Sequence, residues 1–461
     1  MLTPFYFAKK GKSVLLTNDT GHFCFLSQSE FKDFVQGNPG RETEKWQELE
    51  AKQFLFSDSE EGYFRRNEEA VRNAGGYLFE ATNLFILAVT NVCNNRCVYC
   101  QANGGSAARH MSIATAKKAL ERIAESPAAR ITIEFQGGEP LINEEVIRFI
   151  LKEGREILKG KEVQFTLVSN LSRMTEELAG LLREHQVSVS TSLDGPAFLH
   201  DRNRPAADGS STFAATLKGC EILKRYGIFP GAIETTTAFS LSYADQIVET
   251  YAELGFNQLF LRPLTRLGAA AAAWDRIGYT PEQFLAFYRK ALERILKYNR
   301  EGKRITEYHA ALFLSKILQG KAANYMELRS PCGAGLGQMA ITANGNVYTC
   351  DEGRMMAEMG DEAFRLGNVY ENGYSEWIES GTCKAVCSAS LLDTLPGCCD
   401  CVYKPYCGVC PVVNYAINGS ITRNCRDRCR IYKGILDTLF EYIQQNDPET
   451  MDLFGEWSEQ V

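Results

Sequence analysis

The chain has 461 residues, of which 45% are hydrophobic and 23% are charged, and its formal net charge is −7. This length suffices for about two or three domains, and the composition is typical of a globular protein. The acidic balance argues against nucleic acid or an anionic membrane as a partner, and no apolar run is long enough to span a bilayer. Without a signal-peptide pattern at the start, we expect a cytoplasmic protein.

Residues 1–80 are predicted to form a small α+β domain. Two apolar runs around a polar turn predict a hairpin over 13–27, and a helix is expected over 28–37. A second helix is expected over 43–54, followed by a charged connector over 57–76.

From residue 81 to residue 310, strand-like and helical patterns alternate. Six strand-like runs predict strands over 84–90, 130–138, 162–170, 188–195, 231–239 and 257–264. Six β/α units in succession indicate an α/β fold with a parallel sheet, either open or closed into a partial (β/α)6 barrel of the TIM type. Ligands bind at the carboxyl ends of such strands, so the loop after the first strand is the expected site.

Sixteen cysteines are many for such a protein, and they are unevenly placed. Three lie within 93–100 and eleven from Cys332 to Cys429, whereas Cys24 and Cys220 stand alone and are expected to be buried small residues. Disulfide scaffolds are typical of small secreted chains, and this chain is large and has no export signal. Clustered thiols in a reducing compartment favour metal ligands.

The segment 311–435 is rich in glycine and cysteine and too poor in apolar runs for a large core. We predict a domain held by metal clusters there, followed by an amphipathic helix and tail over 436–461. Residues 270–330 have helical patterns.

The first cysteine group is Cys93, Cys97 and Cys100, with Tyr99 before the last thiol. Three thiolates can hold three irons of a [4Fe–4S] cluster and leave the fourth iron open, whereas structural zinc takes four ligands and no histidine is near. This Cys-x3-Cys-x2-Cys spacing after the first strand resembles the radical S-adenosylmethionine (SAM) superfamily.

The resemblance extends to later strand ends. Phe135 to Pro140 is similar to the family's GGEP element, which implies that the backbone of Gly137 and Gly138, and Glu139, meet the methionine part of SAM. Further cofactor contacts are implied at Ser169, Asn170, Ser192, Asp194 and Arg204. For His200, Asp201 and Arg204, which resemble a segment of peptide-modifying members, a structural ion-pair role is weighed equally.

The resemblance implies the family's mechanism. A reduced cluster passes an electron to SAM, and a 5′-deoxyadenosyl radical takes a hydrogen atom from the substrate. An external electron donor such as flavodoxin or ferredoxin is implied.

The second cysteine group resembles the SPASM domain, which carries two auxiliary [4Fe–4S] clusters. One cluster is implied on Cys398, Cys401, Cys407 and Cys429, with Cys425 competing for the last place. The other cluster is implied on Cys332, Cys350 and Cys410. The usual SPASM pattern has three residues between the cysteines that correspond to Cys407 and Cys410, whereas this sequence has two. With these three ligands, one iron of the second cluster would have no protein ligand, unless Cys383 or Cys387 supplies the fourth thiolate. Two zinc sites are an alternative, but they leave the loop 93–100 without an explanation.

Nearly the whole chain is similar to the radical SAM/SPASM maturases of the His-Xaa-Ser system (HxsB-like) and to related cyclophane-forming enzymes. The resemblance implies the oxidative crosslinking of side chains, through a C–C or thioether bond, in a ribosomally synthesised precursor peptide. The N-terminal domain would bind the leader of that peptide by strand addition, or serve only as a packing cap.

Asp351 is the implied catalytic base, because related sulfatase-maturing enzymes place an acid after the corresponding cysteine. The alternative is a hydrogen-bond acceptor for the cluster loop. Glu352 and Arg262 are weaker candidates. Two other functions stay open: a formylglycine-generating anaerobic sulfatase maturase, and a non-catalytic iron–sulfur electron-transfer protein, against which the open three-cysteine site argues.

Overall fold

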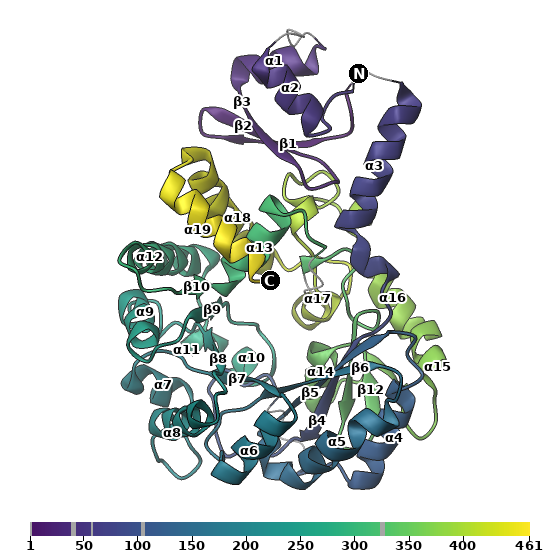
Figure 1. The fold of residues 1–461 in the computed structure, drawn as a ribbon, viewed down its shortest axis with the longest axis vertical. Helices are drawn as coiled ribbons and strands as arrows, with labels where there is room; N and C mark the ends of the chain where they lie inside the picture. The colour runs from purple at the N-terminus through teal and green to yellow at the C-terminus, as the bar shows by residue number, and fades with distance from the viewer. Residues whose placement is uncertain (1, 38–42, 57–58, 103–106, 323–327) are drawn as a thin grey trace.

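The computed structural model describes residues 2–37, 43–56, 59–102, 107–322 and 328–461. Figure 1 shows a small sheet with helices at the N-terminal end and a large sheet surrounded by helices, with two C-terminal helices between them. No described helix combines the length and the hydropathy that crossing a membrane requires.

The N-terminal part is a three-stranded antiparallel sheet in the order β1-β2-β3. Its elements are β1 (Tyr6–Lys10), β2 (Ser13–Thr17), β3 (Phe23–Ser27), α1 (Gln28–Val35) and α2 (Glu44–Ala51). The predicted hairpin is confirmed, whereas β1 was not predicted. The Ser27 hydroxyl accepts from the Glu30 N–H while the Glu30 carboxylate accepts from the Ser27 N–H, and this capping box starts α1.

The helix α3 (Glu60–Ala74) lies where we expected a charged connector, so that prediction is wrong. Charged residues support a helix when opposite charges stand one turn apart, as Arg72 and Glu68 do at 2.8 Å. The Ser59 hydroxyl caps the first turn. Figure 1 shows α3 running from the N-terminal sheet toward the larger part of the molecule, and the short 3-10 helix η1 (Gly76–Phe79) follows it.

The large sheet has ten described strands in the order β10-β9-β8-β7-β6-β5-β4-β11-β12-β13. Its centre consists of six parallel strands that are consecutive in the chain: β4 (Leu84–Thr90), β5 (Arg130–Gly137), β6 (Glu162–Val168), β7 (Ser188–Ser192), β8 (Gly231–Thr235) and β9 (Gln258–Arg262). The predicted α/β fold is therefore confirmed. β4 is largely apolar because its residues are buried on both faces.

Helices join these strands and surround the sheet in Figure 1: α4 (Ile113–Ile123), η2 (Pro140–Asn143), α5 (Glu144–Ile157), α6 (Glu176–Glu184), α7 (Ala197–Asn203), α8 (Thr212–Arg225) and α9 (Ala244–Glu253). The side chains of Ser112, Thr175 and Ser211 accept from backbone N–H groups at the starts of α4, α6 and α8. α5 buries Ile147, Ile150 and Leu151, which lie on one face at helical spacing.

The strands at the two edges of the large sheet follow the barrel in the chain. β10 (Thr306–Glu307) pairs with β9, and β11 (Gln338–Thr342) pairs in parallel with β4 and leads into the antiparallel strands β12 (Asn346–Tyr348) and β13 (Arg365–Asn368). Four described α-helices lie between β9 and β11: α10 (Gly268–Ala272), α11 (Trp274–Ile277), α12 (Pro281–Arg300) and α13 (Tyr308–Leu318). The cysteine-rich part thus continues the barrel's own sheet, a connection that the sequence did not predict.

The C-terminal part is helical apart from β12 and β13. Its helices are α14 (Asp351–Glu358), α15 (Tyr374–Glu379), α16 (Gly381–Ala389), η4 (Leu392–Thr394), η5 (Lys404–Tyr406), α17 (Pro411–Asn418), α18 (Arg426–Gln445) and α19 (Pro448–Glu459). α18 passes without a break through residue 435, where we expected a domain boundary. Its Phe440 ring lies 5.3 Å from the Phe23 ring of β3, so α18 connects the barrel to the N-terminal sheet (Figure 1).

One continuous apolar core joins these parts. Leu15 of β2, Leu87 of β4, Phe284 of α12 and Trp457 of α19 all belong to it and are almost completely buried. A smaller core in the cysteine-rich part contains four thiols, those of Cys332, Cys350, Cys410 and Cys425. Burying apolar area at these contacts is the main force that holds the parts together.

Candidate active site

A cavity of about 940 Å³ lies at the carboxyl ends of the parallel strands. Its wall includes Cys93, Cys97 and Cys100 from the loop after β4. It also brings together most of the residues that the resemblance implied as cofactor contacts: Tyr99, Gly137, Gly138, Glu139, Ser169, Asn170, Ser192 and Arg204. Asp194 is the exception, because it is completely buried behind this wall.

The thiols of this loop are unbridged and face hydrogen-bond donors. The Asn95 N–H lies 3.4 Å from the Cys93 sulfur, the Asn170 amide nitrogen 3.9 Å from the same sulfur, and the Arg204 guanidinium 4.0 Å from the Cys97 sulfur. Burial raises the pKa of Cys93 to about 11 and that of Cys97 to about 12. Buried thiols with donors aimed at them suit thiolates that are neutralised by a bound cationic centre.

The three thiols share one cavity without converging on a single point. In the described part of the chain, no three cysteine, histidine, aspartate or glutamate side chains lie close enough to hold one metal ion. A cluster several atoms across needs ligands that are further apart than those of a zinc ion. Three thiols without an imidazole therefore fit a [4Fe–4S] cluster better than zinc.

Gly137 and Gly138 let the end of β5 pass close to the cysteine loop. A Cβ on Gly137, whose φ is +138°, would lie 2.0 Å from the Thr90 carbonyl oxygen, and one on Gly138 would lie 2.3 Å from the Val92 carbonyl oxygen. The Gly138 N–H donates to the Thr90 carbonyl at 2.8 Å. A side chain at either position would displace the start of the loop that carries Cys93.

Glu139 ties the ends of neighbouring strands together. Its carboxylate accepts from the Ser169 hydroxyl at 2.7 Å, from the Asn170 N–H at 2.8 Å and from the Leu141 N–H at 3.1 Å. Burial raises the pKa of this carboxyl group, which the three donors oppose. Glu139 thus positions Ser169 and Asn170 at the cavity and also lines it.

Arg204 and Asp194 form a buried ion pair beside the cysteine loop. The Arg204 Nε lies 3.1 Å from Asp194 Oδ2, and the same oxygen accepts from the Tyr99 hydroxyl at 2.7 Å. The guanidinium carbon lies 5.1 Å from the centre of the Tyr99 ring. Asp194 therefore holds two residues of the cavity wall and does not reach the cavity itself.

His200 and Asp201 have structural contacts. The His200 Nδ1 accepts from the Asp194 N–H at 3.3 Å, and burial lowers the pKa of this imidazole to about 4, so it is neutral. Asp201 accepts from the Phe213 N–H at 2.8 Å and the Ser211 hydroxyl at 2.7 Å, and thereby holds the start of α8.

Asp351 is the first residue of α14, directly after Cys350. Its Oδ1 accepts from Arg354 through Nε at 2.8 Å and Nη2 at 2.5 Å. Arg354 is only 1% exposed and lines the cavity, whereas Asp351 does not line it. Arg354 therefore lies between Asp351 and the site. The sequence analysis missed Arg354, although it follows Asp351 by three residues on a helix, a spacing that typically brings two side chains together.

A second group near this arginine was also missed. Glu134 on β5 accepts from the Gln136 amide at 2.5 Å and the Thr166 hydroxyl at 3.2 Å, and burial raises its pKa with the like charge of Asp351 as a further cause. Arg262 lines the cavity and lies 3.9 Å from Glu352. No local motif marks Glu134, because only the folded chain brings its carboxylate near Asp351.

The second cysteine group contains two sets that adjoin each other. The first set is Cys398, Cys401, Cys407 and Cys429, which line a cavity of about 520 Å³ together with Cys410 and Cys425. Burial raises the pKa of Cys407 to about 12, and the other three thiols of this set act on it as nearby charges. The Asn424 amide donates to the Cys398 sulfur at 3.0 Å.

The other set is the thiol group of the smaller core: Cys332, Cys350, Cys410 and Cys425. Burial raises the pKa of Cys350 well above its ordinary value, with Cys410 and Cys332 as charged neighbours. Cys410 and Cys425 both contact Asn414. The Asn414 N–H donates to the Cys410 carbonyl at 3.0 Å, and the Cys425 N–H donates to Asn414 Oδ1 at 2.8 Å. Cys425 is thus buried in the smaller core but also lines the cavity of Cys429, so it lies beside both sets.

The remaining cysteines lie outside both sets. Cys24 and Cys220 are buried in apolar surroundings, as predicted. Cys383 on α16 is buried in the main core and packs against Gly335, and Cys399 is exposed.

The central part of the chain matches a known family. Residues 87–260, which include the cysteine loop and the ends of β4 to β8, match the model of the Radical SAM superfamily. This part of the chain is therefore similar to radical SAM enzymes, which use a [4Fe–4S] cluster and SAM.

Two curated relatives match different lengths of the chain. The chain is 32% identical over 174 residues to an uncharacterized protein of Methanocaldococcus jannaschii, covering 38% of this chain and 60% of that protein. It is 23% identical over 308 residues to a cysteine-type anaerobic sulfatase-maturating enzyme of Clostridium perfringens, covering 65% and 80% of the two chains. The chain thus spans less than two thirds of the first relative's length.

Two solved structures share the fold. Native anSMEcpe with bound AdoMet superposes with a TM-score of 0.67 at 19% identity, covering 79% of this chain and all of the other. Streptococcus suis SuiB bound to its precursor peptide SuiA has a TM-score of 0.56 at 12% identity, covering 93% and 99% of the two chains.

Proposed function

We propose that this chain is a peptide maturase that oxidatively crosslinks side chains of a ribosomally synthesised precursor, through a cyclophane-type C–C bond or a thioether. The observation that carries this proposal is the cavity at the strand ends. Three thiols, and no fourth among the described residues, line a space of about 940 Å³. Such a site leaves room for SAM and for a substrate side chain beside an incompletely ligated cluster.

In this proposal Cys93, Cys97 and Cys100 hold the [4Fe–4S] cluster. Bound together, the cluster and SAM supply a radical that removes a hydrogen atom from a substrate carbon. Glu139 and Asp194 position the groups that surround SAM.

In this proposal Asp351 is the base for the proton that crosslinking releases, and Arg354, which binds its carboxylate, lies between Asp351 and the cavity. An aromatic ring that forms a new bond to carbon must lose a proton and a second electron. The two sets of cysteines, each holding an auxiliary [4Fe–4S] cluster, would take that electron, and an external flavodoxin or ferredoxin would supply electrons to the first cluster.

A peptide substrate is supported by the relatives. Streptococcus suis SuiB is bound to a precursor peptide, and the Clostridium perfringens relative is a sulfatase-maturating enzyme, which acts on a protein. We propose that the N-terminal sheet binds the leader of the precursor by strand addition, because β1 and β3 are its edge strands. Residues 1–80, 81–310, 311–435 and 436–461 remain our proposed functional division of the chain.

The test is an anaerobic assay of the reconstituted enzyme with SAM, a reductant and a candidate precursor peptide, to be sought among the reading frames beside the gene. We expect 5′-deoxyadenosine and a peptide that has lost two hydrogens per modification, with fragment spectra that locate the new bond. Cys97→Ala should abolish both products, whereas Cys220→Ala, which changes a buried thiol of the core, should retain them.

A formylglycine-generating activity is the second candidate, because the chain covers 80% of the Clostridium perfringens sulfatase-maturating enzyme. The same assay separates the two functions. A peptide in which one Ser or Cys has become an aldehyde, with no crosslink, would replace the crosslinking proposal by this one.

A further inference from the structure

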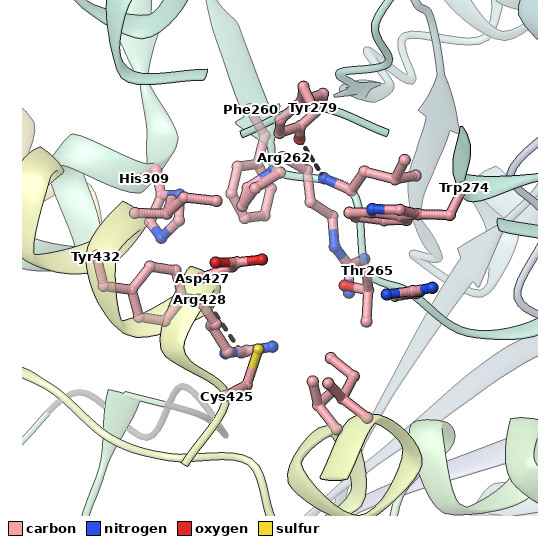
Figure 2. A pocket seen from close by; sticks show the side chains of 16 residues that line it. Phe260, Arg262, Thr265, Trp274, Tyr279, His309, Cys425, Asp427, Arg428 and Tyr432 are labelled. Atoms are coloured by element: carbon pink, nitrogen blue, oxygen red, sulfur yellow. Dashed lines mark hydrogen bonds between the residues drawn. The ribbon is translucent and has the colours of Figure 1, made fainter. Parts of the chain in front are cut away.

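A second cavity of about 800 Å³ lies between the barrel and the C-terminal helices. Figure 2 shows Phe260, Tyr279 and Trp274 on the barrel side, and His309 and Tyr432 on the opposite side. The size is that of a pocket for a small ligand or a few side chains, and five of its sixteen lining residues are aromatic. Of the residues considered above for catalysis or for the clusters, only Arg262 and Cys425 line it.

This cavity adjoins the candidate active site. Arg262 and Pro263, at the end of β9, line both cavities, so one short segment separates the cavity of Figure 2 from the SAM cavity. A substrate side chain held in the cavity of Figure 2 therefore lies next to the candidate active site, where the chemistry occurs. Such a position is typical of a site that holds and orients a substrate.

The aromatic groups of this cavity are fixed by contacts within the chain. The Phe260 and His309 ring centres are 5.5 Å apart and nearly perpendicular, and His309 meets Tyr432 edge-on at 5.3 Å. The Tyr279 hydroxyl accepts from the Leu264 N–H at 2.6 Å. Rigid aromatic walls bind a flat apolar guest at little conformational cost, and an aromatic guest adds stacking and edge-to-face contacts.

The charge of this cavity is predominantly positive. Three guanidinium groups line it, those of Arg262, Arg266 and Arg428, and Asp427 is the one acid among its described lining residues. Arg428 donates to the Tyr432 hydroxyl at 2.9 Å, and Arg266 lies over the Trp274 ring at 5.4 Å. Both guanidinium groups are thus held beside aromatic rings, where they favour a carboxylate.

We propose that this cavity binds an aromatic side chain of the precursor peptide together with the carboxylate of an adjacent acidic residue. The proposal rests on the peptide-maturing function and names the class of substrate segment that the site accepts. The aromatic ring lies among Phe260, Trp274 and Tyr432, and Arg428 holds the carboxylate. The segment is thereby anchored beside the active site while a neighbouring carbon faces the SAM cavity.

Two synthetic peptides test this proposal: acetyl-Gly-Glu-(4-fluoro-Phe)-Glu-Gly-amide and its counterpart with Gln in place of both Glu residues. The ¹⁹F signal of each is titrated with the full, anaerobically reconstituted chain. We expect the acidic peptide to bind about tenfold more tightly, which corresponds to one charge-assisted contact. Arg428→Gln should remove this difference without weakening the Gln peptide.

Arg430→Gln is the matched control, because Arg430 lies on the same helix α18 but pairs with Glu282 outside the cavity. It should leave the tenfold difference unchanged. Trp274→Leu should weaken both peptides by a similar factor, since it removes an aromatic wall and no charge.

Equal binding of the two peptides, no ¹⁹F change at millimolar concentrations, or equal effects of Arg428→Gln and Arg430→Gln would overturn the proposal. The measurement involves no turnover, so it is separate from the crosslinking assay. If the chain binds the acidic peptide but makes no crosslink, the proposed reaction is wrong and the proposed binding site stands.

Discussion

The hydroxyl of Tyr99 donates a 2.7 Å hydrogen bond to the buried carboxylate of Asp194. This bond links the cysteine loop after β4 to the end of β7, two segments that are 95 residues apart in the chain. Arg204 pairs with the same carboxylate oxygen, so one buried acid positions both the loop and a guanidinium that lies near the Cys97 sulfur. The geometry of the thiols therefore depends on a residue outside the cavity.

Tyr99→Phe should destabilise the protein by about 1–2 kcal/mol, because it leaves a buried carboxylate with one donor fewer. The thermal midpoint of the reconstituted protein measures the effect. Tyr415→Phe is a suitable control, since that hydroxyl bonds Asp361 near the surface and its loss should not shift the midpoint. Equal midpoints for Tyr99→Phe and wild type would show that the Tyr99 bond contributes nothing.

Gly138→Ala should lower 5′-deoxyadenosine formation at least tenfold. The added Cβ would lie 2.3 Å from the Val92 carbonyl oxygen, and the loop that carries Cys93 would have to move. Gly455→Ala in α19 is the comparison, because no atom lies within 4 Å of its Cβ and alanine favours a helix by about 1 kcal/mol. Undiminished 5′-deoxyadenosine in Gly138→Ala would contradict this reading of the loop.

Cys425→Ala should remove about four irons per chain, the content of one [4Fe–4S] cluster, if Cys425 completes the set of Cys332, Cys350 and Cys410. Iron analysis and the EPR spectrum of the reduced protein are the readouts, and neither requires turnover. Exposed Cys399 supplies the control, and Cys399→Ala should keep the full content. If Cys383→Ala loses the iron instead and Cys425→Ala does not, the fourth ligand lies on α16.

Asp351→Asn should lower crosslinked product by about 10²–10⁴-fold while 5′-deoxyadenosine formation continues, because the change removes a proton acceptor and leaves the cysteine loop intact. Both products are measured in one anaerobic reaction. Glu379→Gln, at an exposed position at the end of α15, should leave both unchanged. A parallel loss of 5′-deoxyadenosine would instead indicate that Asp351 supports the cluster loop.

His200→Gln should reduce the loss of stability on acidification. Burial lowers the pKa of His200 in the folded chain to about 4, whereas the pKa of an exposed histidine is about 6.5. Between these two pH values the unfolded chain binds more protons than the folded chain, so the wild type loses stability as the pH falls. The lost stability is about 1 kcal/mol from pH 7.5 to pH 5.5. Thermal midpoints of both proteins at the two pH values test this, and identical shifts would mean that His200 titrates normally.

Local patterns were enough to predict the barrel. Each of the six central strands is a short strand-like run bounded by a helical pattern, and Ser112, Thr175 and Ser211 mark helix starts by their own hydrogen bonds. The helix α3 was missed for a related reason, because its charged residues were taken as a sign of a connector although they pair along the helix.

The sequence by itself determined the alternation of strands and helices, the three-thiol loop and the two later cysteine groups, because spacing and periodicity are local properties of the chain. Only the tertiary structure decided that Asp194 stays behind the cavity wall, that Arg354 stands between Asp351 and the cavity, and that β11 extends the barrel's sheet beside β4. It also buried Cys425 in the smaller core, whereas Cys429, four residues further along the chain, is only half-buried. These arrangements depend on contacts between residues far apart in the chain, which burial of the shared core selects and which no local pattern encodes.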